Sequence, residues 1–204
     1  MSARLSEDYR YSSYDLCYGY FFSNRGHLIN NNLEKSCLYL WAYLSSWGMV
    51  ARGNELQDKS FAFLKPVVKY IQANPQYYTS SIDSPQYMPE MLELYGGLKR
   101  ALRLNQKSQK TMITKIMLGV YGCIPAFDSR VSSFFKTTTI GNLSPKNIQS
   151  IIDFYTQRRH RNTIDNLARS TFLFDFSGTR LRAAGSINPS YSPAKIIDMI
   201  AFIR

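Results

Sequence analysis

Cysteine and histidine are scarce in this sequence of 204 residues. The three cysteines, Cys17, Cys37 and Cys123, are odd in number and widely spaced, and the only histidines are His27 and His160. Such a set excludes a disulfide framework and a CxxC metal site. It also leaves too few ligands for zinc and few bases for a Ser-His-Asp triad. We therefore expect a chain without a metal or another cofactor, in a reducing compartment.

Long apolar runs are missing as well. No stretch of about 18 uncharged apolar residues is present, so no segment is predicted to span a membrane. The first residues, MSARLSEDYRYSSYD, have no apolar core of the kind found in secretory signals. At 45% hydrophobic and 14% aromatic residues, the chain can bury a core and is not predicted to be disordered. A cytoplasmic location without a membrane partner is the expectation.

Negative charge is rare in the second half of the chain. Residues 1–95 carry 8 Lys and Arg against 9 Asp and Glu, whereas residues 96–204 carry 17 against 5. The whole net charge of +11 thus comes from the second part, which has +12 against −1 for the first. This asymmetry favours a polyanionic partner, nucleic acid before a membrane surface. The alternative is that the charge only keeps the protein in solution.

Apolar residues recur at helical spacing through most of the chain, and no strand-like alternation is sustained. We predict an all-α fold, a single compact multi-helix domain over residues 1–204. Within it we expect an aromatic-rich N-terminal arm (1–30), a near-neutral helical part (31–95) and a basic helical DNA-binding part (96–204). No internal repeat is apparent, and no obligate protein partner is indicated.

Proline and glycine predict several boundaries inside this helical pattern. Pro66 is expected to kink or split a helix over residues 61–71. The pair Gly96-Gly97 predicts a break between two short helices. Ser144-Pro145 and Ser192-Pro193 each predict a helix start, with a serine cap and proline in the first turn. The cluster Arg158-Arg159-His160-Arg161 is expected to close a helix at its carboxyl end, where the helix dipole favours cations.

Asp128 is the residue with the strongest chemical signature. It precedes the apolar run of residues 129–135 and is placed to cap a short helix, which is the simplest explanation for an aspartate there. It is also one of only five carboxylates among the 17 cations of the basic part. An anion in such surroundings also suggests a functional role.

The residues around Asp128 resemble a known family. The phrase Ile124-Pro125-Ala126-Phe127-Asp128-Ser129-Arg130-Val131, and the spacing from Lys110 to Asp128, are similar to the core of the helix-hairpin-helix DNA glycosylases. The resemblance covers residues 95–135. The Gly-rich hairpin of that family is replaced by Leu94-Tyr95-Gly96-Gly97 and a segment without glycine next to Lys110. The segments YLSSWGMVARG and TKIMLGVYGCIPAFD also resemble a widespread group of uncharacterised bacterial proteins, which implies no function.

The resemblance implies a DNA glycosylase that extrudes a base and hydrolyses its N-glycosidic bond. Asp128 is then the catalytic carboxylate, stabilising the positive charge that develops on the sugar. The family lysine matches Lys110 by spacing and Lys115 by its Thr-Lys-Ile context. Either lysine is expected to contact phosphate or, alternatively, to attack the sugar carbon. The alternative without a functional role is that both lysines lie at solvent-exposed helix edges.

The remaining candidates follow from charge and aromaticity. The predicted base pocket consists of Trp47, Arg52 and Tyr121. The predicted DNA-binding residues are cations of the basic part: Lys99, Arg100, Arg103, Lys107, Arg130, Arg158, Arg159 and Arg161.

The sequence therefore predicts a DNA glycosylase, without cofactor, acting on double-stranded DNA that contains a modified or damaged base. Its setting is base repair or anti-phage defence. The alternative is a non-enzymatic, basic helical nucleic-acid-binding module, a regulator or a component of a defence system. A weaker alternative is a helical protein that binds a partner chain through the face of Trp47.

Overall fold

The computed structural model describes residues 12–51, 53–54, 56–103, 109–181 and 190–203. Within these ranges the regular structure is helical, apart from two isolated antiparallel bridges, Phe172 with Ser190 and Phe174 with Arg180. The all-α prediction is confirmed. The α-helices are α1 (Ser12–Ser23), α2 (Leu33–Ser46), α3 (Lys65–Ala73), α4 (Tyr87–Leu102), α5 (Lys110–Tyr121), α6 (Ser129–Phe134), α7 (Pro145–Thr156), α8 (Arg158–Ser170) and α9 (Pro193–Ile203), with 3₁₀ turns at Asn30–Asn32, Phe61–Leu64 and Pro75–Thr79.

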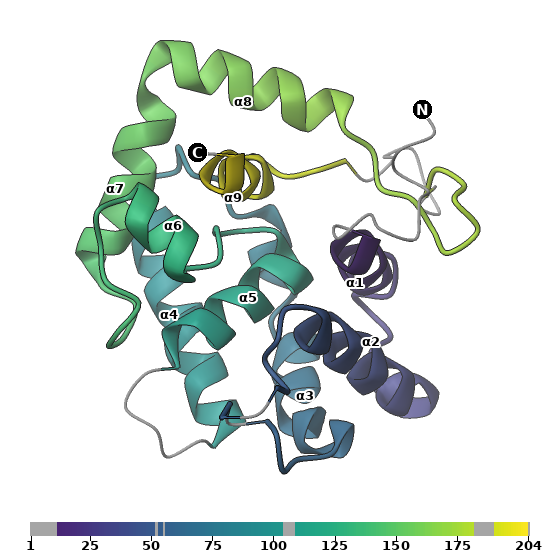
Figure 1. Ribbon diagram of the computed structural model, residues 1–204. Helices are drawn as coiled ribbons and strands as arrows, with labels where there is room; N and C mark the ends of the chain where they lie inside the picture. Colours follow the sequence, from purple (N-terminus) through teal and green to yellow (C-terminus); the bar gives the residue numbers. More distant parts are fainter. Residues whose placement is uncertain (1–11, 52, 55, 104–108, 182–189, 204) are drawn as a thin grey trace.

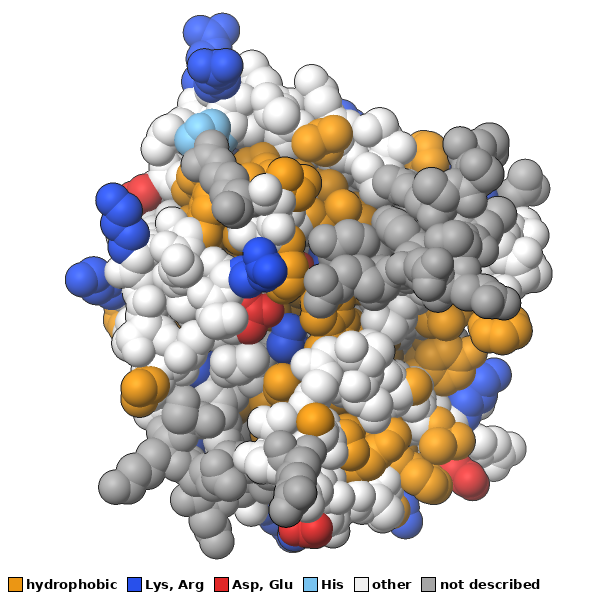
Figure 2. Space-filling model, viewed as in Figure 1, with side chains coloured by type: hydrophobic (Ala, Val, Ile, Leu, Met, Phe, Trp, Pro, Cys, Tyr) orange, Lys and Arg blue, Asp and Glu red, His pale blue; other side chains and the backbone are white. Residues whose placement is uncertain are grey.

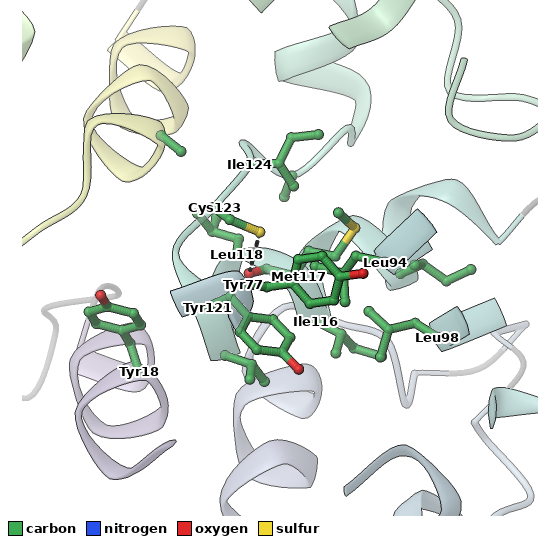
Figure 3. Packing of buried hydrophobic residues seen from close by; sticks show 14 of the residues in the cluster. Tyr18, Tyr77, Leu94, Leu98, Ile116, Met117, Leu118, Tyr121, Cys123 and Ile124 are labelled. Carbon is green, nitrogen blue, oxygen red and sulfur yellow. Dashed lines mark hydrogen bonds between the residues drawn. The ribbon is translucent and has the colours of Figure 1, made fainter. Parts of the chain in front are cut away.

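Helix α5 lies in the middle of the molecule (Figure 1). It contacts α1, α2 and α4, and every one of its residues except Thr111 is buried. Its apolar side chains join one hydrophobic core that extends from Tyr14 of α1 to Ala201 of α9. Figure 3 shows part of this core, where Ile116, Met117 and Tyr121 of α5 pack near Leu94 and Leu98 of α4. A helix this deeply buried is a rigid support for any side chain it projects toward the surface.

Local signals predicted several helix boundaries correctly. The run around Pro66 is split, with a 3₁₀ turn over Phe61–Leu64 followed by α3, in which the proline occupies the first turn. Ser144 caps α7 and forms a reciprocal capping box with Asn147, and α9 begins at Pro193. Gly48, in the left-handed region, follows α2. These signals act within one helical turn, which is why the sequence alone suffices for them.

The predicted break at Gly96-Gly97 is wrong, because α4 runs through both glycines without interruption. A Cβ atom at Gly97 would lie 2.0 Å from the hydroxyl oxygen of Tyr70, on α3. The second glycine is thus required for the close approach of α3 to α4. Gly96 has open space around it, with only the end of Arg100 at 3.5 Å.

Buried tyrosines are numerous, and they predict a loss of stability in alkali. Burial raises the pKa of Tyr14, Tyr43 and Tyr87 well above the ordinary value. Above pH ~10 these phenols ionise in the unfolded chain only, so the unfolded chain binds fewer protons and the free energy of unfolding falls as pH rises, by about 1.4 kcal/mol per pH unit for each tyrosine. Burial lowers the pKa of Lys110 and Lys115, which acts in the opposite direction but involves fewer groups.

The measurement is denaturant unfolding at pH 8, 9.5 and 11, with tyrosinate absorbance recorded in parallel. Absorbance that appears only together with unfolding is the expected result. A free energy of unfolding that stays constant up to pH 11 would show that these phenols titrate in the folded protein.

Candidate active site

The site is built around the turn between α5 and α6, residues 122–128. Gly122, with a φ of 64°, ends α5 in the left-handed conformation that glycine adopts without strain. Three hydrogen bonds from α4 and α5 fix the backbone of the turn: Tyr87 Oη to the Cys123 carbonyl (2.8 Å), Thr111 Oγ1 to the Phe127 carbonyl (2.9 Å) and the Phe127 amide to Thr114 Oγ1 (2.9 Å). The last residue of this turn therefore has a well-defined position.

Asp128 is that residue, and its two oxygens have different partners. Oδ1 accepts hydrogen bonds from the amides of Arg130 (3.0 Å) and Val131 (3.1 Å), so the predicted helix cap is confirmed. Oδ2 lies 3.3 Å from Nζ of Lys115. The Asp128 side chain is 16% exposed, against 5% for Lys115. The carboxylate thus caps a helix with one oxygen and forms an ion pair with the other, and its side chain is partly accessible.

Lys115 projects from the buried helix α5 into the space between Asp128 and Trp47. Its ammonium lies 4.5 Å from the centre of the Trp47 ring, a cation–π contact. Burial lowers the pKa of Lys115, and the negative charge of Asp128 opposes that effect. The alternative interpretation of this lysine, a solvent-exposed position at a helix edge, is wrong. With its side chain almost completely covered, the ammonium cannot reach a phosphate on the surface.

Lys110 has the spacing of the family lysine but does not contact Asp128. Its ammonium donates to the carbonyl of Thr138 and lies 5.7 Å from the centre of the Phe127 ring. The residue is only 1% exposed, and burial lowers its pKa. Lys110, like Lys115, therefore does not lie at a solvent-exposed helix edge. Of the two candidate lysines, Lys115 is the one that the fold brings to the carboxylate.

A hollow lies between α6 and α9, and its lining begins at Ser129, the residue after Asp128 in the chain. Its volume is about 550 Å³, and its lining residues are Ser129, Arg130, Ser133, Phe134 and Ala201. Arg130 is exposed, and its guanidinium lies 5.7 Å from the ring centre of Phe202. Figure 2 shows acidic and basic side chains next to each other in the middle of this face, with hydrophobic side chains around them. The hollow combines two hydroxyls, one guanidinium and one aromatic ring.

Two of the predicted base-pocket residues, Trp47 and Tyr121, lie in different surroundings. Trp47 is partly buried, contacts Lys115 and packs edge-on against Tyr43 and Phe202. Tyr121 is 2% exposed and lies in the core, with its ring against Tyr77 and Tyr78. Arg52 lies outside the described residues. Of the two described residues, only Trp47 is therefore near the Lys115–Asp128 pair.

The predicted DNA-binding cations are mainly on the surface. Lys99 is half-buried, and its ammonium donates to Asn142 Oδ1 at 2.9 Å. Lys107 lies outside the described residues. The exposed ones are Arg100, Arg103, Arg130, Arg158, Arg159 and Arg161. They belong to the end of α4, the start of α6 and the start of α8.

The prediction that the arginine cluster closes a helix is wrong, since residues 158–161 open α8. The chain turns at Gln157, where the backbone is extended. There the ring of His160 packs on Phe154 at 4.2 Å, and its Nδ1 contacts the Phe154 carbonyl at 3.0 Å. That carbonyl is one of the last in α7, which have no partner within the helix. The helix dipole disfavours cations at this end, so it does not explain the arginines.

Arg161 has local partners of its own. Its guanidinium contacts the carboxylate of Asp83 and lies 3.8 Å from that of Asp165. Arg158 and Arg159 are exposed at the same helix end. Of the three arginines, these two are the better placed to contact a polyanion.

Two charged residues near the site were missed in the sequence. Lys195 and Asp198 of α9 are 0% and 2% exposed and form an ion pair of 3.0 Å. The available signal was their i, i+3 spacing in the apolar segment PAKIIDMIAFI. Charged residues within an otherwise buried helix have to be paired, so this pattern is a usable indicator.

Comparisons with family models, with curated proteins and with solved structures find no match to this chain. In the described part of the chain, no helix has the length and hydropathy needed to cross a membrane.

Proposed function

We propose that this protein is a DNA N-glycosylase, a divergent member of the helix-hairpin-helix DNA glycosylases. The observation that carries the proposal is the Lys115–Asp128 pair: a partly accessible carboxylate, at the end of a rigid turn, beside a hollow in the basic part of the chain. The resemblance around Pro125 and Asp128 supports the same assignment. Substrates are double-stranded DNA with a damaged or modified base, in repair or in anti-phage defence.

The proposed reaction is hydrolysis of the bond between the base and the sugar. As that bond lengthens, positive charge develops on the sugar, and an ionised Asp128 stabilises it by electrostatic attraction. Water adds to the sugar carbon and the base leaves with a proton, so that an abasic site remains. Oδ2 of Asp128 is the oxygen assigned to this role, because it has one partner, Lys115, whereas Oδ1 accepts from two backbone amides of α6.

Lys115 supports the carboxylate in this scheme rather than attacking the sugar. Its ammonium lies 3.3 Å from Asp128 Oδ2 and forms an ion pair with that carboxylate. A lysine nucleophile requires a neutral amine with access to the sugar. Lys115 is 5% exposed and faces an anion, so the proposed enzyme hydrolyses the glycosidic bond without cleaving the strand.

Binding of DNA is assigned to the exposed cations. Arg130 borders the hollow next to Asp128, and Arg100, Arg103, Arg158 and Arg159 are exposed elsewhere on the basic part. Contacts of this kind act on phosphates and make binding sensitive to salt. The base itself must leave the stack to approach Asp128. The hollow lined by Ser133 and Phe134 offers hydroxyls and an aromatic ring at that place.

A non-enzymatic nucleic-acid-binding module is the second candidate. One observation favours it: capping of α6 accounts for Asp128 Oδ1 completely, without any chemistry. This alternative predicts salt-dependent binding of DNA with no product.

The test is an abasic-site assay on two sources of DNA, unmodified bacterial genomes and phage genomes that carry modified bases. After incubation with the protein, the DNA is treated with alkali, which cleaves at abasic sites. We expect breaks that appear only after alkali and only with one DNA source. Breaks before alkali would show that a lysine acts as the nucleophile. Binding without breaks on any DNA would support the non-enzymatic module.

A further inference from the structure

The ion pair of α9 is buried in a place where it has no evident structural need. Lys195 Nζ and Asp198 Oδ2 lie 3.0 Å apart, and both side chains are almost completely covered. Removing two charges from water is expensive, and a pair of apolar residues would usually stabilise such a position as well or better. The other contacts of the pair indicate why charges are found there.

Asp198 bonds directly to the turn that positions Asp128. Its Oδ1 accepts a hydrogen bond from the amide of Ala126 at 3.1 Å, while its Oδ2 accepts one from Lys195. Ala126 lies two residues before Asp128. The carboxylate therefore connects α9 to the segment that determines where the candidate catalytic oxygen lies. It adds a fourth hydrogen bond to the three that come from α4 and α5.

The two lysines share one aromatic ring. The Lys115 ammonium lies 4.5 Å and the Lys195 ammonium 5.6 Å from the ring centre of Trp47. Lys195 also lies 4.7 Å from the ring centre of Tyr14. The two ion pairs are thus packed around one indole ring, in surroundings where water does not screen charges effectively.

The charges of the second pair act on Lys115 with opposite signs. After burial and Asp128, the next contributions to the pKa of Lys115 are Asp198, which raises it, and Lys195, which lowers it. Tyr43 of α2 lies near both carboxylates, since burial first, and then Asp198, Cys17 and Asp128, raise its pKa. Together these residues make up the charged and titratable surroundings of Lys115.

We propose that Lys195 and Asp198 are positioning residues for the Lys115–Asp128 pair. Asp198 fixes the turn through Ala126, and the two opposite charges of α9 balance the electrostatic environment in which Lys115 stays charged beside Asp128. The role in base release rests on the proposed function. The coupling between the two ion pairs does not depend on it.

The coupling is tested by titrating Lys115 in two variants with opposite changes of charge. Protein labelled with ¹³C-lysine is titrated by NMR, and the Lys115 Cε signal is assigned by its loss in Lys115→Arg. Asp198→Asn keeps an oxygen for the Ala126 amide but leaves an extra positive charge, so the Lys115 midpoint falls by about one pH unit. Lys195→Gln leaves an extra negative charge, so the midpoint rises by a similar amount. Shifts of opposite sign are the result expected for electrostatic positioning.

If Lys195 and Asp198 had a purely structural role, the Lys115 midpoint would shift in the same direction in both variants or would not shift. Either result, obtained with folded variants, overturns the proposal. If only one variant folds, the sign of its shift decides. If neither folds, the reciprocal coupling is measured in Lys115→Met, which removes one positive charge, with the Lys195 Cε signal assigned by its loss in Lys195→Arg. The Lys195 midpoint rises if the two pairs are coupled, and an unchanged midpoint refutes the coupling.

Base release provides a separate readout. In Asp198→Asn, which keeps the oxygen bonded to the Ala126 amide, we expect base release to fall about tenfold at a pH above the shifted midpoint, because Lys115 loses its proton at lower pH. The alkaline limb of the pH–rate profile should move to lower pH together with the NMR midpoint. If the midpoint shifts while the wild-type protein releases no base, the coupling holds and the glycosylase assignment fails.

Discussion

Asp128→Asn is expected to reduce base release at least 100-fold while DNA binding stays equal or becomes tighter. Loss of a group that stabilises charge in a transition state usually lowers the rate by a factor of about 10²–10³. Asparagine caps helices as well as aspartate does, so the bonds from Arg130 and Val131 to Oδ1 can be kept. Affinity is retained because the change removes a negative charge from a surface that binds phosphates.

The matched control is Asp153→Asn, which removes one carboxylate from an exposed position on α7. Both variants are compared with the wild-type protein by abasic-site formation and by salt-dependent binding. Base release that survives in Asp128→Asn would reject Asp128 as the catalytic residue. An equal loss in Asp153→Asn would point to a change in net charge rather than in chemistry.

Gly119→Ala is expected to lower the free energy of unfolding by about 2–3 kcal/mol, the upper part of the range for overpacked cores. A Cβ atom at this position on α5 would lie 2.3 Å from Cε1 of Tyr43, with two further ring atoms closer than 3.0 Å. Tyr43 is 2% exposed and on α2, so its ring cannot move away without displacing the core. Denaturant unfolding measures the change.

Gly96→Ala is the control for the change to alanine itself. It lies inside helix α4 with open space around its Cα, and alanine favours helices over glycine by about 0.5–1 kcal/mol. We therefore expect a small gain in stability there. If Gly119→Ala and Gly96→Ala lost stability to a similar extent, the close approach of α2 and α5 would not be the reason for a glycine at position 119.

Much of the fold follows from short-range patterns. Helical periodicity predicted the all-α class, and the caps at Asp128 and Ser144 are found as expected. The sequence also pointed to Asp128 as the central residue of the site. It did not decide which lysine would be its partner, since spacing favoured Lys110 and local context favoured Lys115.

The errors came from contacts between distant residues. Gly97 looked like a helix break because its partner, Tyr70 of α3, is not visible in the local sequence. The arginines at 158–161 are an exception, because the contact involved is local: the chain turns at Gln157, and the ring of His160 packs on Phe154, six residues before it. Tyr121 was a candidate for the base pocket but lies in the core.

The sequence by itself thus determined the helical class, several helix starts, the concentration of positive charge in residues 96–204 and the cap at Asp128. Each of these depends on composition or on neighbours within one or two helical turns. Only the tertiary structure decided that Lys115 meets Asp128, that Lys110 turns to Thr138, and that α9 brings a second ion pair to the same tryptophan. Those pairings depend on how α2, α5 and α9 pack around one another, which no local pattern encodes.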